Sequence, residues 1–277
     1  MLSLSCGDDD KGPTGDNGNG SDSIVRISQE GSHPTLSPEG DWVAYKTDSG
    51  IYRSPIAGGD PEKIFSYGLE PDWSWVHDLI LVRAGGITVF DPATGDIVQT
   101  LAVNYDDGPC WSPSGAEIAV QDGGLLVVAY PDGETSRVSC ADTVDSGCEG
   151  EWPTWSPDGQ TLAFEDGLDI MTIPRIGGGI ATPVVYNLWD VSYPTWSPNG
   201  DWIAFLMEDS THQNAHIWVS DARGKGYGLY QLTSGKYIDY GPAWSPDSKF
   251  IYFARRQVDS AFYYTPLGIW RVKFGAE

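Results

Sequence analysis

One short phrase occurs six times along this chain, and its spacing restricts the fold more than any other feature. The copy at residues 153–159 reads Pro-Thr-Trp-Ser-Pro-Asp-Gly. Its Trp position is filled, in order and at steps of 37, 38, 44, 41 and 48 residues, by Leu36, Trp73, Trp111, Trp155, Trp196 and Trp244. A period of about 40 residues is typical of propellers and solenoids, in which each repeat is one structural unit.

Each copy of the phrase predicts a turn between two strands. Pro presets φ at the second turn position, and the Asp, Asn or Ser and the Gly that follow suit a tight turn. Residues 42–45 and 250–253 show the aromatic and β-branched pattern of a following strand, and residues 86–90 and 97–101 are examples of a third and a fourth strand. Four strands per repeat form the blade of a propeller. We therefore expect an all-β, six-bladed β-propeller of four-stranded antiparallel blades.

The two ends of the repeat region supply one blade between them. The sixth repeat has three strands before the sequence ends, and the run Ile24–Ser28 precedes the first phrase as a fourth strand would. Pairing of this N-terminal strand with the last blade would leave no long open edge. We therefore expect residues 24–277 to form one propeller, closed by the N-terminal strand that completes the last blade.

The repeated phrase, followed by Leu-Ala-Phe at residues 162–164, resembles the TolB-type propeller repeat, which also occurs in the propeller domains of prolyl-oligopeptidase-like enzymes. The resemblance covers residues 24–277 and implies a fold rather than a function. The second repeat departs from the pattern, because Trp75-Val76-His77-Asp78 replaces Pro-Asp-Gly. Its turn is expected to differ from the others.

Residues 1–23 are expected to be a signal remnant and a disordered, acidic and glycine-rich tether. Residues 7–23 contain no aliphatic or aromatic side chain, so they cannot bury enough apolar surface to offset the entropy of ordering. The stretch 2–7, Leu-Ser-Leu-Ser-Cys-Gly, resembles the end of a bacterial lipoprotein signal, which implies lipidation of Cys6. That resemblance implies an extracytoplasmic protein, anchored in the periplasm, at the outer membrane or at the cell surface. The alternative is an ordinary disordered tail with an incidental cysteine.

Charge and cysteine spacing restrict the partners and the compartment. The 39 acidic and 16 basic residues give a net charge of −23, which opposes binding to nucleic acid and to anionic membranes, so contact with a membrane is expected only through the lipid anchor. Cys140 and Cys148 are eight residues apart in one loop and are expected to form a disulfide if the protein is exported, or two free thiols in a reducing cytosol. Cys110 stands where other repeats have Thr and is expected to be a small buried thiol.

The loops that enter the first strand of each blade carry aromatic and acidic residues at equivalent places. Equivalent loops of a ring converge on one face, so these residues predict a rim that could bind a basic peptide, a sugar or a cation. The alternative is that the acidic loops are only solvated and that the aromatic side chains pack between blades. The candidate binding residues are Glu70, Asp106, Asp107, Glu151, Trp152, Trp189, Asp190, Tyr193, Asp239 and Tyr240.

Enzyme signatures are mostly absent from the sequence. It has no Gly-x-Ser-x-Gly motif and no phosphate-binding glycine motif, and His212 and His216 flank a hairpin loop rather than share a helix face. We therefore expect no catalytic residue, no metal and no cofactor, and a protein that is not an enzyme but a binding or scaffold module with a protein or peptide partner at the cell envelope. Two alternatives stay open: an extracytoplasmic lyase or hydrolase that uses the rim on a glycan or peptide, and a structural subunit of a larger envelope complex.

Overall fold

A computed structural model of the 277-residue chain describes residues 24–102, 108–129, 134–138, 148–176, 179–186, 190–210, 213–223, 228–258 and 264–275. Every regular element in these ranges is a β-strand, as the alternating apolar pattern predicts. The predicted tether 1–23, with Cys6, lies outside the described residues. Within the described part there is no helix with the length and apolar character needed to cross a membrane.

The strands follow one another in groups that match the sequence repeats. The first strand, β1 (Ile24–Arg26), precedes the first repeat. The first two repeats contain β2 (Ser32–Leu36), β3 (Trp42–Thr47), β4 (Gly50–Pro55), β5 (Glu62–Phe65), β6 (Leu69–Trp73), β7 (Ile80–Arg83), β8 (Ile87–Phe90) and β9 (Ile97–Leu101). The third and fourth contain β10 (Cys110–Trp111), β11 (Ile118–Asp122), β12 (Leu125–Ala129), β13 (Thr135–Arg137), β14 (Glu151–Trp155), β15 (Thr161–Asp166), β16 (Asp169–Pro174) and β17 (Thr182–Val185). The last two contain β18 (Val191–Trp196), β19 (Trp202–Glu208), β20 (Ala215–Asp221), β21 (Leu229–Gln231), β22 (Ile238–Trp244), β23 (Phe250–Val258) and β24 (Tyr264–Lys273).

The Ser of the phrase forms the turn that the sequence predicts. In the first repeat Ser37 Oγ accepts the N–H of Trp42 at 3.0 Å, and the Gly40 N–H donates to the Ser37 carbonyl oxygen at 2.9 Å. Gly40 has a φ of +74°, which glycine adopts without strain. In the second repeat, which lacks Pro-Asp-Gly, Ser74 Oγ instead accepts the N–H of His77 at 3.1 Å. The turn there differs, as its sequence predicts.

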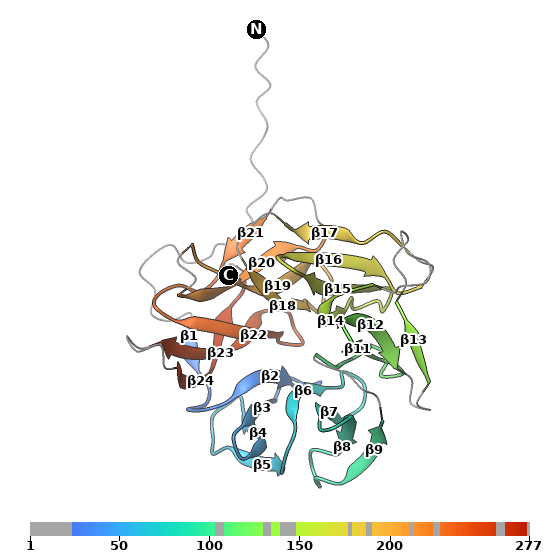
Figure 1. Cartoon of the computed structure of the whole chain (residues 1–277). Helices are drawn as coiled ribbons and strands as arrows, with labels where there is room; N and C mark the ends of the chain where they lie inside the picture. Colours follow the sequence, from blue (N-terminus) through green and yellow to red (C-terminus); the bar gives the residue numbers. More distant parts are fainter. Residues whose placement is uncertain are drawn as a thin grey trace.

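The strands form an all-β propeller with four-stranded antiparallel blades, arranged around a common centre in Figure 1. Four sheets are separate: β2–β5, β6–β9, β10–β13 and β14–β17. The expectation of six separate blades needs correction, because the remaining strands form one eight-stranded sheet. In that sheet a single parallel pair, Ala215↔Ile238, joins β20 to β22. The physical reason is that the start of β20, a middle strand of the fifth repeat, lies close to the start of β22, the innermost strand of the sixth. The two strands share one backbone pairing at that point.

The N-terminal strand pairs with the last strand of the chain, as predicted. β1 runs antiparallel to β24, with Ile24 opposite Val272 and Arg26 opposite Trp270. Just after β1, the Ile27 N–H donates to the Ile269 carbonyl oxygen at 2.7 Å. The first and last described strands therefore close the propeller by hydrogen bonding to each other.

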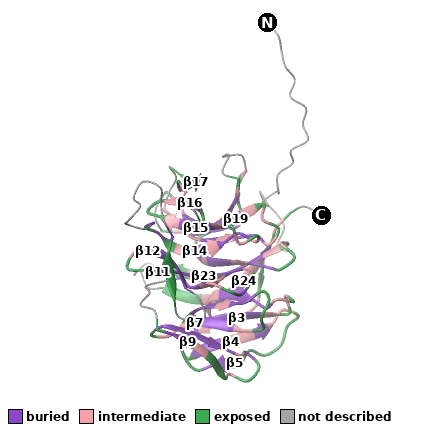
Figure 2. Ribbon diagram, turned by 90° about the vertical axis from the view of Figure 1, so that its right-hand side faces the viewer, coloured by how far each residue is buried: buried purple, intermediate pink, exposed green. Residues whose placement is uncertain are grey.

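The hydrophobic core lies between neighbouring repeats rather than in one central mass. Figure 2 shows buried residues along many of the strands. Among the described residues there are six buried clusters, each with residues from two adjacent repeats. The repeated Trp73, Trp155, Trp196 and Trp244 are all buried in them. The innermost strands contact each other in the closed cyclic order β2, β6, β10, β14, β18 and β22. The centre of this ring is a channel.

Candidate functional site

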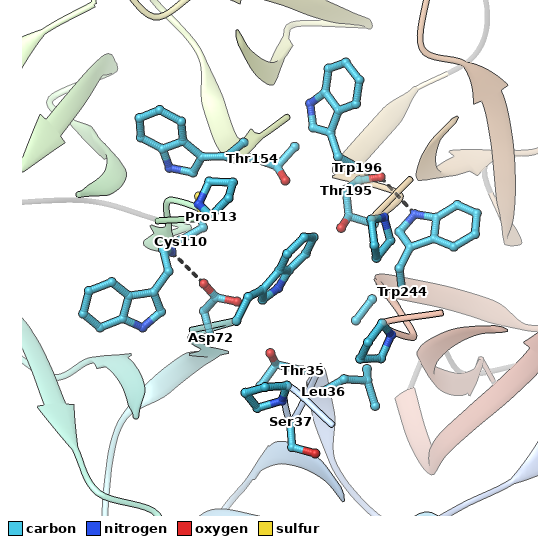
Figure 3. Close-up of a pocket in the computed structure, with 17 residues that line it drawn as sticks. Thr35, Leu36, Ser37, Asp72, Cys110, Pro113, Thr154, Thr195, Trp196 and Trp244 are labelled. Atoms are coloured by element: carbon cyan, nitrogen blue, oxygen red, sulfur yellow. Dashed lines mark hydrogen bonds between the residues drawn. The ribbon is translucent and has the colours of Figure 1, made fainter. Parts of the chain in front are cut away.

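The residue before each repeated Trp or Leu faces the channel. In order, these positions hold Thr35, Asp72, Cys110, Thr154, Thr195 and Ala243, which we call the waist. All six line both of the cavities that occupy the channel. Figure 3 shows the polar side chains of Thr35, Asp72, Thr154 and Thr195 around the centre.

Waist side chains connect neighbouring inner strands. Three hydrogen bonds run from the Trp73 N–H to Thr35 Oγ1 (3.0 Å), from the Trp111 N–H to Asp72 Oδ2 (2.7 Å), and from Cys110 Sγ to the Pro153 carbonyl oxygen (2.9 Å). Each bond links a repeat to the next one along the chain. Cys110 is a free, half-buried thiol, and its burial raises the pKa of that thiol. The sequence predicts a small buried thiol here, whereas the structure leaves Cys110 partly exposed.

One end of the channel, here called the mouth, is formed by the residues two positions before the waist. They are His33, Glu70, Gly108, Trp152, Tyr193 and Gly241, and each has a positive φ between 49° and 66°. A residue before proline is normally extended, and a left-handed non-glycine residue costs about 1–3 kcal/mol. The register between inner and second strands shifts at this point in five repeats. These bulges project the mouth side chains over a cavity of about 150 Å³.

Aromatic side chains from four repeats meet at the mouth. Trp152 and Tyr193 have ring centroids 4.4 Å apart, and His33 lies 5.9 Å from Trp152, from Tyr193 and from Tyr240. A Cβ atom at Gly108 would lie 3.0 Å from Trp152 Cα, so glycine there leaves room for the indole. The sequence-predicted aromatic residues Trp152, Tyr193 and Tyr240 are thus brought together.

Burial determines the protonation state of this aromatic cluster. It lowers the pKa of His33 to about 4 and raises the pKa of Tyr193 to about 12. Among the described residues, no hydrogen-bond partner lies near His33 Nδ1. The guanidinium of Arg256 lies 4.9 Å from the Tyr240 ring centroid and 4.2 Å from that of Tyr264. At neutral pH the cluster is therefore uncharged, with one arginine beside it.

Two of the predicted acidic residues are paired with arginines inside the fold. Glu70 is buried, lies 2.6 Å from Arg83 Nη2 and accepts the N–H of Gly108 at 3.1 Å. Asp239 is fully buried and bonds Arg255 through both carboxylate oxygens, at 2.6 and 2.7 Å. Their charges are compensated, so the structure gives them a role in holding the strands together.

Two other predicted acids lie at the outer side of the mouth. Glu151 is exposed on β14 and pairs across the sheet with Glu165, while Asp190 is half-buried just before β18. Burial, with the nearby charges of Glu151 and Asp190, raises the pKa of Glu165 to about 7. These three carboxyl groups make one side of the mouth acidic. The predicted rim residues Asp106, Asp107 and Trp189 lie outside the described residues.

The predicted disulfide and the histidine pair fall partly outside the described part. Cys140 and His212 are not among the described residues. Cys148 is buried against β12, and its N–H donates to the Val138 carbonyl oxygen at 2.8 Å. His216 is buried on β20. Within the described ranges no group of three His, Cys, Asp or Glu side chains is placed to hold a metal ion.

The opposite end of the channel lies among the hairpin tips. A cavity of about 220 Å³ is lined there by the phrase prolines Pro38, Pro113, Pro198 and Pro246. The second repeat has Trp75 at the equivalent position, and the indole lines the same cavity while remaining 44% exposed. The departure of this repeat from Ser-Pro-Asp-Gly therefore places an aromatic side chain in the channel.

Several residues of the channel were missing from the sequence prediction. Asp72 occupies a position where three other repeats have Thr, and an alignment of the six copies would have revealed the extra carboxyl group. His33 takes the place of Trp152 in the first copy in the same way. Arg83 and Arg256 carry no local signal, because their partners are on other strands.

Solved structures share this architecture. TolB from Acinetobacter baumannii matches 91% of this chain with a TM-score of 0.60 at 16% identity, and this chain spans 65% of its length. The fold is a TolB-like β-propeller. Hydrazine synthase of Kuenenia stuttgartiensis (TM-score 0.56, 16% identity) is matched over 88% of this chain and 81% of that one. No family model matches the sequence, and no curated protein is significantly similar to it.

A further neighbour corrects one expectation. XC5397 from Xanthomonas campestris, described as a gluconolactonase, has a TM-score of 0.65 at 11% identity, with 92% of this chain and 90% of that chain covered. That neighbour is a propeller of similar architecture and is described as an enzyme. This neighbour contradicts the expectation that the protein is not an enzyme. The motifs missing from the sequence belong to enzymes of other folds and say nothing about catalysis in a propeller channel.

Proposed function

We propose that this protein is a binding propeller that holds a segment of a partner protein at the mouth of its channel. The observation that carries the proposal is the aromatic cluster of Trp152, Tyr193, Tyr240 and His33, which come from four repeats. Three of these residues, His33, Trp152 and Tyr193, lie on left-handed backbone positions. Backbone strain of this kind is concentrated where a fold positions side chains for a ligand. Large, flat aromatic groups are also the commonest anchors of protein interfaces.

The charge beside the cluster favours a partner segment with basic residues. Glu151, Glu165 and Asp190 lie together on one side of the mouth, and the whole chain carries a net charge of −23. Carboxylates at a rim increase the rate of encounter with a basic partner, while desolvated aromatic contacts slow its dissociation. Asp106, Asp107 and Trp189 are proposed to extend this surface.

The proposal includes a place in the cell and an organisation of the chain. We infer that residues 1–23 tether the propeller of residues 24–277 outside the cytoplasm, with a lipid on Cys6 and a disulfide between Cys140 and Cys148. The sequence around Cys6 and the acidic, glycine-rich spacer support the anchor. We also infer that the eight-stranded sheet acts as two blades, so that the ring has six. Its halves are each four-stranded, and one residue pair joins them.

The binding test compares two faces of the ring. A partner is captured from detergent-solubilised envelope with the wild-type protein, identified and purified, and its affinity is then measured for two sets of variants. Trp152→Ala should weaken binding about thirtyfold, the factor for an anchor worth ~2 kcal/mol, mainly through faster dissociation. Glu151→Gln with Asp190→Asn should slow association, and added salt should reduce the effect.

The matched control removes two exposed carboxylates from the opposite face. Asp60→Asn with Asp96→Asn changes the net charge by the same amount in the turns after β4 and β8. Binding should be unchanged in this variant. If it is lost there and retained in the mouth variants, the partner binds the hairpin-tip face and the proposed surface is wrong.

The anchor has its own test. Expressed behind a bacterial lipoprotein leader, the protein should partition with membranes and incorporate labelled fatty acid, and Cys6→Ala should abolish both. A soluble, unlabelled wild-type protein would exclude the anchor and leave the binding surface unaffected.

A further inference from the structure

The waist carries a carboxyl group with no cation to pair with. Asp72 accepts the N–H of Trp111 at 2.7 Å and a hydrogen bond from Thr35, and no ion pair to it is present among the described residues. Figure 3 shows this carboxyl group on one wall of the channel, with a dashed line for its hydrogen bond. Buried carboxylates are normally paired with a cation or bind one, because desolvation of an isolated charge is costly.

The surroundings of Asp72 supply no such charge. The other ionisable groups that line the two cavities are Cys110 on β10 and, at the mouth, His33, Glu70 and Tyr193. His33 is neutral at physiological pH and Glu70 is paired with Arg83. Burial without a compensating cation raises the pKa of Asp72 to about 7. The waist therefore favours a positively charged group that enters from outside.

The cavity next to Asp72 is suited to an organic cation. Besides the waist residues, its walls include four prolines and several tryptophans. One of these, Trp75, is 44% exposed and belongs to the repeat whose turn departs from the others. Aromatic faces attract cations and stack on flat apolar groups. The volume of about 220 Å³ is below the range typical of drug-sized ligands, so the ligand is small. A metal ion is a poorer fit, because the described residues offer no cluster of three ligands.

We propose that the hairpin-tip end of the channel binds a small primary amine, with its ammonium group on Asp72 and its apolar part against Trp75. The negative charge of the whole chain concentrates such cations near the channel. This site is at the other end of the channel from the proposed protein-binding surface. The amine-binding proposal therefore does not depend on whether that surface binds a protein.

The test uses isothermal titration calorimetry with 2-phenylethylamine and its neutral counterpart 2-phenylethanol. The amine should bind at least about tenfold more tightly than the alcohol, because only the amine places a charge on Asp72. Asp72→Asn keeps an oxygen that can accept the Trp111 N–H, so the fold should be retained, as checked by circular dichroism. This variant should bind both compounds equally weakly.

Further variants distinguish binding at Asp72 and Trp75 from attraction of the amine by the net negative charge of the chain. Asp96→Asn removes the same charge from an exposed turn outside the cavity and should leave amine affinity within about twofold. Trp75→Ala should weaken both compounds, and Trp75→Phe should restore most of the loss. A peptide that begins with phenylalanine carries the same ammonium group. Exclusive binding of that peptide would overturn the assignment to a small amine.

Proton release gives an independent readout. The ammonium group favours the ionised carboxylate, so amine affinity should rise between about pH 6 and about pH 8, and binding heats should depend on the ionisation enthalpy of the buffer. Both effects should vanish in Asp72→Asn. Equal affinity for amine and alcohol, an unaffected Asp72→Asn variant, or an equal loss in Asp96→Asn would each overturn the proposal.

Discussion

Buried and exposed ion pairs in this ring differ in what they contribute to stability. Asp239 and Arg255 are both almost fully buried and bond through two contacts, whereas Glu62, bonded to Arg53, has a side chain that is 48% exposed. Asp239→Ala should lower the free energy of unfolding by about 3–5 kcal/mol, because it leaves a buried guanidinium unpaired. Glu62→Ala should cost no more than about 1 kcal/mol. Urea unfolding of the two variants provides the comparison, and equal losses would contradict it.

Asp72 should make stability depend on pH in the direction opposite to most carboxyl groups. Its pKa is raised from 3.8 to about 7 on folding, so the folded protein binds a proton that the unfolded chain releases. The free energy of unfolding should therefore fall as pH rises from about 4 to about 7. Asp72→Asn should raise the melting temperature at pH 8 and leave it unchanged at pH 3.5.

Asp158 is the matched control for that measurement. Hydrogen bonds from Ser156 and from the Gln160 N–H lower its pKa, so its contribution is present above the unfolded pKa and lost as pH falls through the folded one. Asp158→Asn should lower the melting temperature at pH 8 rather than raise it. The same sign for both variants would show that Asp72 is not destabilised by its burial.

At the scale of residues, the features that the sequence does not predict are those that depend on contacts between strands or repeats. The turn Ser and the buried Trp were predictable, because each acts within its own repeat or at a fixed place in it. The left-handed backbone at Trp152 and Tyr193 was not predictable, since local sterics favour an extended residue before proline. The pairing of Asp239 with Arg255 depends on two strands whose register the sequence does not show.

At the scale of elements, the N-terminal strand closes the ring, and its removal should have a sharp boundary. Deletion of residues 1–22 leaves β1 in place and should not change the melting temperature. Deletion of residues 1–30 removes β1 and the bonds from Ile27 and Ser28 to Ile269, so it should lower the melting temperature by several degrees. Equal melting temperatures for the two proteins would rule out a stabilising role for this strand.

A point variant tests the same closure without shortening the chain. Gly268 has a φ of +89°, and a Cβ atom there would lie 2.1 Å from the Ser28 carbonyl oxygen. Gly268→Ala should therefore push the N-terminal segment away from β24 and approach the effect of the longer deletion. Gly123→Ala adds a methyl group at a positive φ with no described atom within 4 Å, and should cost only the backbone strain, about 1 kcal/mol.

Elements were more predictable than their assembly into sheets. The predicted strand at residues 42–45 lies inside β3, and the one at 97–101 coincides with β9. The one at 86–90 begins one residue before β8. Four separate blades follow the prediction, but the pair Ala215↔Ile238 merges the last two repeats. A single bridge of this kind depends on how closely two repeats approach, which periodicity does not encode.

For the whole molecule, the net charge of −23 should make the folded state sensitive to salt. Like charges crowded on a compact surface repel one another more than in the expanded unfolded chain. The melting temperature should therefore rise between about 20 mM and about 500 mM sodium chloride, as the Debye length falls. Differential scanning calorimetry measures the change. A melting temperature that falls with salt would mean that attractive ion pairs outweigh the repulsion.

The pairing of β1 with β24, which joins the two ends of the ring, lies in the eight-stranded sheet. This side of the ring therefore contains the longest continuous set of backbone hydrogen bonds among the described strands. Across the ring, β10 has only two residues, and its neighbours β6 and β14 belong to separate sheets. The part of the ring that contains the closing strand pair is therefore more extensively hydrogen-bonded than the part opposite it. We therefore expect fluctuations that widen the channel to be largest near β10, the strand that carries Cys110.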